Sequence, residues 1–301
     1  MSDAVAEYVV DAARKVLGPV GVCLPVSFTS PPSIHLQREA VGRLERAGYC
    51  TVWTNEVIGK DALVQLATLL ADSERMVFGT CIANIWARAP QTMHAAAAQL
   101  AQAHPGRIVL GLGVGYPQQA ASVGKEFGSP LATMRDYLER MGSPTWPPAP
   151  DAGYARIVAA NGPKMLALAA ELADGALPAG LPTEFTARAR RSLGPDRLLV
   201  VGLSVARDMQ AARKAVSPRL AVPSYTSGLL ELGYPDEDIE VVSDRLINAL
   251  VAHGDSVHIV DKVRDHLAAG ADHVTLLPTM GGEFAAGIDR LAELGPALAE
   301  L

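Results

Sequence analysis

Short apolar runs alternate with amphipathic stretches along most of the chain. The runs are rich in Val, Leu, Ile and Gly and apolar on both faces, which is typical of strands in a parallel sheet covered on both sides. The stretches between them place apolar residues with helical spacing. In 33–47, for example, Val41 and Leu44 share one face, and Gly48 ends the pattern. The pattern predicts a repeated strand–helix unit.

Eight strands are predicted, at 18–25, 50–54, 76–82, 107–113, 154–160, 174–178, 198–204 and 273–277. Helices are predicted at 33–47, 61–71, 90–103, 130–141 and 163–173, with a last one close to Leu301. An α/β chain of eight strands, each usually followed by a helix, favours a (β/α)8 TIM barrel over an open doubly wound sheet. Residues 1–301 are expected to form a single domain, since such barrels run to about 250 residues or more.

Two segments lie outside this repeat. Residues 1–18 lack the basic and apolar regions of a signal peptide and predict an amphipathic helix that covers the bottom of the barrel. Residues 220–254 predict an irregular helical insertion before the last βα unit, and their Gly, Pro and Tyr content would allow a lid. No stretch approaches the roughly 20 apolar residues of a membrane span.

Composition narrows the classes of function. The 301 residues carry 26 basic and 32 acidic side chains, a net charge of −6, without a basic run, which argues against nucleic-acid binding. Cys23, Cys50 and Cys81 have neither disulfide nor zinc spacing and predict reduced thiols in a cytoplasmic protein. The histidines have no metal spacing, which argues against a metal site and a metal-dependent hydrolase.

Functional residues of α/β barrels lie just beyond the carboxyl ends of the strands. This rule selects candidates without comparison to any other protein. They are Asn55, Glu56, Ala83, Asn84, Trp86, Val114, Gly115, Tyr116, Gln119, Asn161, Gly162, Lys164, Ala179 and Gly180.

The run 160–164 predicts an anion site. Asn161 and Gly162 open a helix whose free N–H groups and dipole attract phosphate, and Lys164 adds positive charge. The alternative is an ordinary turn in which Asn caps the helix and Pro takes its first position.

The glycine-rich run 111–116 matches a dinucleotide-binding fingerprint only in part. Tyr116 stands where the GxGxxG pattern requires a last glycine, and no clean helix follows. A Rossmann site is therefore rejected. The glycines would let a flat cofactor approach the backbone, or relieve crowding inside the barrel.

Glu56 is the candidate acid or base. It is a carboxylate at the end of the second strand, beneath the expected pocket, where burial would suit it to proton transfer. The alternative is a salt bridge with Arg88 or Lys60.

Several motifs from Gly18 onward occur together. They are GVCLP, LERAGYCTVWTNE, ERMVFGTCIANIWARAPQTMHAAAAQLAQAHPGRIVLGLGVGY, AANGPKMLALAAELADGALP and VRDHLAAGADHVTLLP. In combination they resemble the luciferase-like monooxygenase superfamily, and within it the coenzyme F420-dependent oxidoreductase branch of actinobacterial type. The resemblance covers nearly the whole chain.

The resemblance implies a deazaflavin or flavin at the mouth of the barrel. A cis peptide between Cys81 and Ile82 would form a bulge behind the ring. The implied cofactor contacts are Asn55, Cys81, Ile82, Ala83, Asn84, Val114 and Gly115 around the ring and ribityl chain, and Asn161, Gly162, Lys164 and Met165 around the phosphate.

The resemblance also implies hydride transfer between F420 and a small organic substrate, with Glu56 as proton donor or acceptor. Trp53, Trp86, Tyr116, Gln119 and Ala179 are expected to line the substrate pocket. Similar sugar-phosphate and alcohol dehydrogenases carry His near the position of Glu56 and often Glu at that of Tyr116, which argues against those substrates. Two alternatives stay open: an FMN-dependent monooxygenase using O₂, and a non-catalytic barrel that only binds cofactor.

Similar barrels usually dimerise through the helices predicted here at 61–71 and 90–103. Both are rich in Ala and Leu, which permits close packing, so a homodimer is expected. The alternative is that these faces pack only on their own barrel.

Overall fold

The computed structural model describes residues 3–279 and 282–301. A closed parallel barrel forms from β1, β2, β3, β5, β6, β7, β8 and β10, because β10 pairs with both β8 and β1. This confirms the predicted (β/α)8 TIM barrel. The strands are β1 (Val20–Cys23), β2 (Thr51–Thr54), β3 (Val77–Thr80), β4 (Ala83–Asn84), β5 (Ile108–Gly113), β6 (Ala155–Ala159), β7 (Gly175–Leu177), β8 (Leu198–Ala206), β9 (Val251–His253) and β10 (His273–Pro278).

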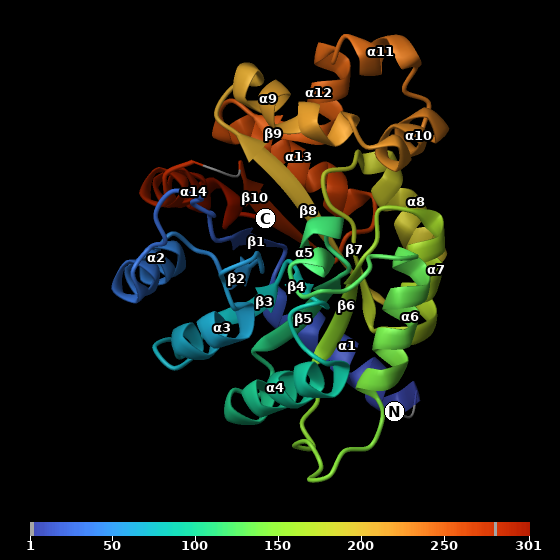
Figure 1. The fold of residues 1–301 in the computed structure, drawn as a ribbon. Helices are drawn as coiled ribbons and strands as arrows, with labels where there is room; N and C mark the ends of the chain where they lie inside the picture. The colour runs from blue at the N-terminus through green and yellow to red at the C-terminus, as the bar shows by residue number, and fades with distance from the viewer. Residues whose placement is uncertain (1–2, 280–281) are drawn as a thin grey trace.

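Helices surround the barrel (Figure 1). They are α1 (Asp3–Leu17), α2 (Ile34–Arg46), α3 (Ala62–Leu70), α4 (Pro90–Ala103), α5 (Pro117–Ala121), α6 (Pro130–Met141), α7 (Pro163–Leu172), α8 (Thr183–Leu193), α9 (Met209–Leu220), α10 (Pro223–Glu231), α11 (Asp236–Glu240), α12 (Asp244–Leu250), α13 (Ser256–Ala268) and α14 (Phe284–Leu298). Asp61 caps α3 as predicted, since its side chain accepts a hydrogen bond from the N–H of Val64 at 2.9 Å. Within the described residues, no helix is both long and apolar enough to cross a bilayer.

Two short strands correct the predicted elements. β4 follows β3 and pairs with β5. β9 lies at the end of the segment 220–254, which is predicted as an irregular helical insertion without a strand, and pairs with the carboxyl end of β8. With two and three residues respectively, these strands are too short to show an alternating pattern in the sequence.

Helices α9 to α12, called the insertion below, stand above the carboxyl ends of the strands (Figure 1) and begin before the predicted boundary at residue 220. They have an apolar cluster of their own, which includes Val216, Leu229 and Leu246. Tyr225 and Leu232 pack against both this cluster and the main core, so the insertion is continuous with the barrel.

The amino-terminal helix closes the bottom of the barrel, as predicted. Val10 and Leu17 of α1 pack in one cluster with Leu198 and other residues that point into the barrel. Burying these side chains stabilises the fold by about 25 cal/mol per Å² of apolar surface removed from water.

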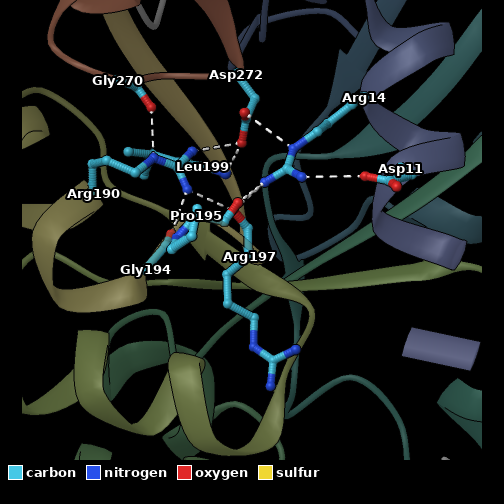
Figure 2. A network of polar contacts seen from close by, with 9 residues as sticks. All are labelled: Asp11, Arg14, Arg190, Gly194, Pro195, Arg197, Leu199, Gly270 and Asp272. Carbon is cyan, nitrogen blue, oxygen red and sulfur yellow. Dashed lines mark hydrogen bonds and ion pairs between the residues drawn. The ribbon is translucent and has the colours of Figure 1, made fainter. Parts of the chain in front are cut away.

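A hydrogen-bond network fastens α1 to the strands (Figure 2). Asp272, just before β10, accepts from Arg14 Nε at 3.1 Å, from Arg190 Nη2 at 2.7 Å and from the N–H of Leu199 at 2.7 Å. Arg14 also donates to the carbonyl oxygen of Arg197 at 3.0 Å. One carboxylate therefore joins α1, α8 and β8.

A buried histidine links strands inside the barrel. His273 is 0% exposed; its Nε2 accepts from the indole N–H of Trp53 at 3.0 Å and its Nδ1 donates to the carbonyl oxygen of Gly18 at 2.8 Å. Glycine is needed at position 21, because a Cβ there would lie 2.8 Å from His273 Nε2. Burial lowers the pKa of His273 to about 4, so the ring is neutral at pH 7.

We expect Asp272→Asn to lower the free energy of unfolding by about 2 kcal/mol, because it weakens three hydrogen bonds, two of them to guanidinium groups. Chemical denaturation measures the change. Asp289→Asn is the control: this exposed carboxylate bonds only Arg43, and the expected loss is under about 1 kcal/mol. Equal losses in both variants would contradict the structural role of Asp272.

Stability is expected to fall as the pH drops from about 6.5 towards 4. Burial lowers the pKa of both His273 and His266 to about 4, whereas an unfolded histidine takes up its proton near 6.5. Each histidine thus contributes roughly 3 kcal/mol that is present above pH 6.5 and lost on acidification. Denaturation across this range measures the slope. His273→Gln keeps hydrogen-bonding groups but does not titrate and should reduce the slope by about half; an unchanged slope would contradict the assignment.

Candidate functional site

The carboxyl ends of β2 and β3 meet at a buried carboxylate. Glu56 is 5% exposed and its carboxylate accepts from the N–H of Ala62 at 2.9 Å and that of Asn84 at 2.8 Å. Arg88 Nη1 donates to both of its oxygens, at 2.9 and 3.0 Å, and Arg88 also pairs with Asp61. The sequence left two interpretations of Glu56 open, and the structure shows one of them, the salt bridge with Arg88. The role of Glu56 in proton transfer stays a prediction.

Lys60 lies near the ends of β1 and β2, and from the sequence it is expected only as a possible partner of Glu56. Its Nζ donates to Thr54 Oγ1 at 2.8 Å and to Asn55 Oδ1 at 3.0 Å. Burial lowers its pKa, while the neighbouring Cys23 and Glu56 raise it. Within the described residues, no carboxylate oxygen lies within 4 Å of this ammonium group, so its charge is held mainly by neutral oxygens.

The end of β3 carries the expected backbone feature. The peptide bond between Cys81 and Ile82 is cis, which confirms the position predicted from the resemblance. Ile82 projects toward Gly113 of β5, where a Cβ would lie 2.7 Å from Ile82 Cδ1. Cys81 and Ile82 pack against the barrel interior, next to Cys23. The neighbouring Cys81 thiol lowers the pKa of Cys23, while the Cys23 thiol and burial raise that of Cys81.

Asn84 ends β4, and Trp86 follows it at the mouth. Asn84 is buried and its Oδ1 accepts from the N–H of Trp86 at 3.0 Å. The indole N–H of Trp86 donates to the carbonyl oxygen of Val114 at 2.7 Å, which joins the ends of β4 and β5. Ala83, which pairs in register with Leu112, is fully buried beneath them.

The loop after β5 lies beside Glu56. Gly115 has a φ of 57°, and a Cβ there would overlap the side chain of Gln119, so glycine suits this position. Gln119 Oε1 accepts from the N–H of Tyr116 at 2.9 Å, and its Nε2 donates to the Glu56 carbonyl oxygen at 3.5 Å. Tyr116 itself is 69% exposed.

The amino terminus of α7 has the properties of an anion site. Gly162 caps the helix without a side-chain hydrogen bond, and a Cβ at Gly162 would meet no atom within 4 Å. Across the described part of the chain, no acceptor bonds the N–H groups of Lys164 and Met165. The side chain of Asn161 does not cap this helix; it bonds the N–H of Ala179 at 2.9 Å and its carbonyl oxygen at 3.2 Å. The alternative of an ordinary turn is met only in part, because proline takes the first helical position but Asn161 does not cap the helix. Free N–H donors therefore remain for an anion.

Trp53 lies away from the other predicted pocket residues. It is 0% exposed and points into the barrel beneath the mouth, where it bonds His273 and packs over Gly79. A Cβ at Gly79 would overlap the Trp53 ring, so glycine makes room for it. Trp53 supports the floor of the site from below and does not line its surface.

The sequence analysis missed residues contributed by the insertion. Arg219 of α9 donates to Ser204 Oγ at 3.3 Å, and Tyr225 of α10 donates to the carbonyl oxygen of Gly180 at 2.5 Å. Both reach the ends of β7 and β8. No local motif distinguishes them from other Arg and Tyr residues in this irregular segment.

Barrel fold and site geometry thus define a (β/α)8 protein with a glycine-rich mouth and unbonded N–H groups at the start of α7. The chain belongs to the luciferase-like monooxygenase family, whose model matches residues 19–273. Within residues 3–279 and 282–301 we find no group of three His, Cys, Asp or Glu side chains arranged to hold a metal ion.

Two curated proteins are similar to this chain over most of its length. A putative coenzyme F420-dependent oxidoreductase of Mycobacterium tuberculosis is 29% identical over 87% of this chain and 95% of its own. A 5,10-methylenetetrahydromethanopterin reductase of Archaeoglobus fulgidus is 26% identical over 74% of this chain and 77% of its own.

Solved structures share the fold at low identity. An F420-dependent secondary alcohol dehydrogenase in complex with an F420–acetone adduct superimposes with a TM-score of 0.72 at 17% identity, over 93% of this chain and 98% of that one. The oxygenating constituent of 3,6-diketocamphane monooxygenase of Pseudomonas putida, in complex with FMN, gives 0.67 at 14% identity, over 93% of this chain and 97% of that one.

We expect Glu56→Gln to lower the free energy of unfolding by about 3 kcal/mol, because it leaves the Arg88 charge buried with less compensation. Glu45→Gln is the matched control, since the partner of Glu45, Arg75, is 83% exposed and the expected loss is under about 1 kcal/mol. If Glu56 also transfers a proton, Glu56→Gln lowers turnover without weakening cofactor binding. Unchanged turnover at saturating cofactor would rule out that second role.

Proposed function

We propose that the protein is an F420-dependent oxidoreductase that transfers a hydride between the deazaflavin and a small organic substrate. The observation that carries the proposal is the α7 amino terminus with its unbonded N–H groups, which suit a phosphate, in a barrel of the luciferase-like monooxygenase family with a putative coenzyme F420-dependent oxidoreductase among its relatives. The deazaflavin supplies the hydride chemistry when bound.

The proposed work of the chain is binding and orientation. Asn161, Gly162, Lys164 and Met165 hold the phosphate, with helix dipole and backbone N–H groups as the main attraction. Asn55, Cys81, Ile82, Ala83, Asn84, Val114 and Gly115 form the surface against the ring and ribityl chain. This surface is preorganised, since Asn84 and the backbone around it are fixed by Glu56 and Trp86.

The substrate is proposed to bind above this surface. Trp86, Tyr116, Gln119 and Ala179 border the mouth, and Phe28 and Ile58 expose large apolar side chains on neighbouring loops. Such a border suits a substrate with substantial apolar surface. Glu56 stays the proposed proton donor or acceptor. Because it is paired with Arg88, that role has to be tested separately from its part in the salt bridge.

The FMN-dependent monooxygenase remains the second candidate function. It is supported by the FMN-containing structure with the same fold. F420 is preferred because one of the two curated relatives described above is a putative coenzyme F420-dependent oxidoreductase. The other is a methylenetetrahydromethanopterin reductase. A homodimer through α3 and α4 also stays a prediction.

Equilibrium binding of F420 and of FMN, followed by quenching of the three tryptophans, tests the proposal. We expect F420 to bind at least about tenfold more tightly than FMN, a difference of about 1.4 kcal/mol. Preference for FMN would replace the proposal with the O₂-dependent alternative. Binding of F420 without turnover with any reductant or substrate would favour the non-catalytic barrel.

A further inference from the structure

A second cationic group stands beside the proposed phosphate site, and it comes from the insertion. Arg219 lies in the last turn of α9, and its guanidinium covers Gly180 at the end of β7. Gly180 has a φ of 65°, and a Cβ there would overlap Nη1 of Arg219, so only glycine leaves room for this approach.

The position of Arg219 is fixed from two sides. Its Nη1 donates to the buried hydroxyl of Ser204 on β8 at 3.3 Å. Tyr225 bonds the carbonyl oxygen of Gly180 at 2.5 Å and lies close enough to Arg219 for the guanidinium to lower its pKa, although burial raises that pKa more. The cation is therefore held at the mouth by neutral groups.

No acidic side chain neutralises this cation within residues 3–279 and 282–301. Other arginines of the insertion do pair, as Arg213 does with Asp244 and Arg245 with Asp238, but no carboxylate oxygen lies within 4 Å of Arg219. A partly buried guanidinium without a counterion favours binding of an anion.

The neighbourhood connects Arg219 to the α7 terminus. Asn161, next to the cap of α7, holds Ala179 through both its N–H and its carbonyl oxygen, and the next residue is Gly180 beneath Arg219. The ends of β6, β7 and β8 thus place Arg219 on the same part of the rim as the free N–H groups of Lys164 and Met165.

We propose that Arg219 forms a second anion subsite, which binds the phosphate- and carboxylate-bearing tail of the cofactor beyond the contacts made by α7. This inference rests on the proposed function for the identity of the cofactor. It assigns to the insertion a direct part in ligand binding, through charge-assisted hydrogen bonds from its guanidinium.

The test compares ligands that differ only in the anionic tail. F420 carries phosphate and glutamyl carboxylates, whereas its deazaflavin core, FO, has neither. We expect Arg219→Gln to raise the Kd of F420 by about tenfold or more and that of FO by less than about twofold. Arg219→Lys should recover part of the affinity, because it keeps the charge but loses the planar fork.

Arg207→Gln is the matched control. Arg207 lies between β8 and α9, its side chain is 86% exposed and it pairs with Asp208, so this variant removes the same charge from an exposed guanidinium that already has a counterion. Both Kd values should stay within about twofold of the native protein. The dependence of F420 affinity on salt should be shallower in Arg219→Gln than in the native protein, a change that a purely structural role would not produce.

Each outcome separates the two proposals. Equal weakening of F420 and FO by Arg219→Gln, or no effect on either, would overturn the tail subsite but would not contradict the proposal that F420 is the cofactor. If the native protein binds FMN instead, the proposed cofactor is wrong. The effect of Arg219→Gln on the Kd of FMN, compared with its effect on the Kd of riboflavin, then decides whether Arg219 binds the anionic group. If the native protein binds none of the four, both proposals fail.

Discussion

Closure of the barrel by β10 is the constraint on which the rest of the structure depends. β10 pairs with β8 on one side and β1 on the other, so each barrel strand has a partner on both edges and all carboxyl ends meet at one rim. The closed interior must then be filled. Trp53 and His273 occupy it with a hydrogen bond between them, and α1 covers its lower end. The rim is left as the place where loops from distant parts of the sequence come together.

The rim is organised around the buried pair of Glu56 and Arg88. Through its carboxylate, Glu56 fixes the start of α3 and the backbone of β4, and β4 contains the proposed cofactor contacts Ala83 and Asn84. A group held this firmly positions the site whether or not it also transfers a proton. Lys60 differs from Glu56 because its ammonium group donates to neutral oxygens and not to a carboxylate. Its positive charge at the same edge is therefore not neutralised by an ion pair.

The insertion has a different relation to the barrel. Its own apolar cluster keeps α9 to α12 together, while Arg219 and Tyr225 anchor it at the ends of β7 and β8. The proposed binding region therefore has two parts: a surface built by strands and βα loops, and a cationic edge supplied by the insertion, whose apolar cluster is continuous with the barrel core. Differences in the insertion could alter ligand affinity while the barrel stays the same.

The sequence by itself determined the barrel, the position of the cis peptide, the covering role of α1 and the helix start at 163, because these follow from local patterns, caps and motif resemblance. It also selected Glu56 and Asn161 as rim residues, but their partners stayed open. Only the tertiary structure decided that Glu56 pairs with Arg88, that Asn161 bonds Ala179 and not its own helix, and that Trp53 faces the interior. β9 and Arg219 could not be predicted either. A three-residue strand shows no period, and the contact of Arg219 with Gly180 joins residues far apart in the chain whose proximity arises only when the barrel closes.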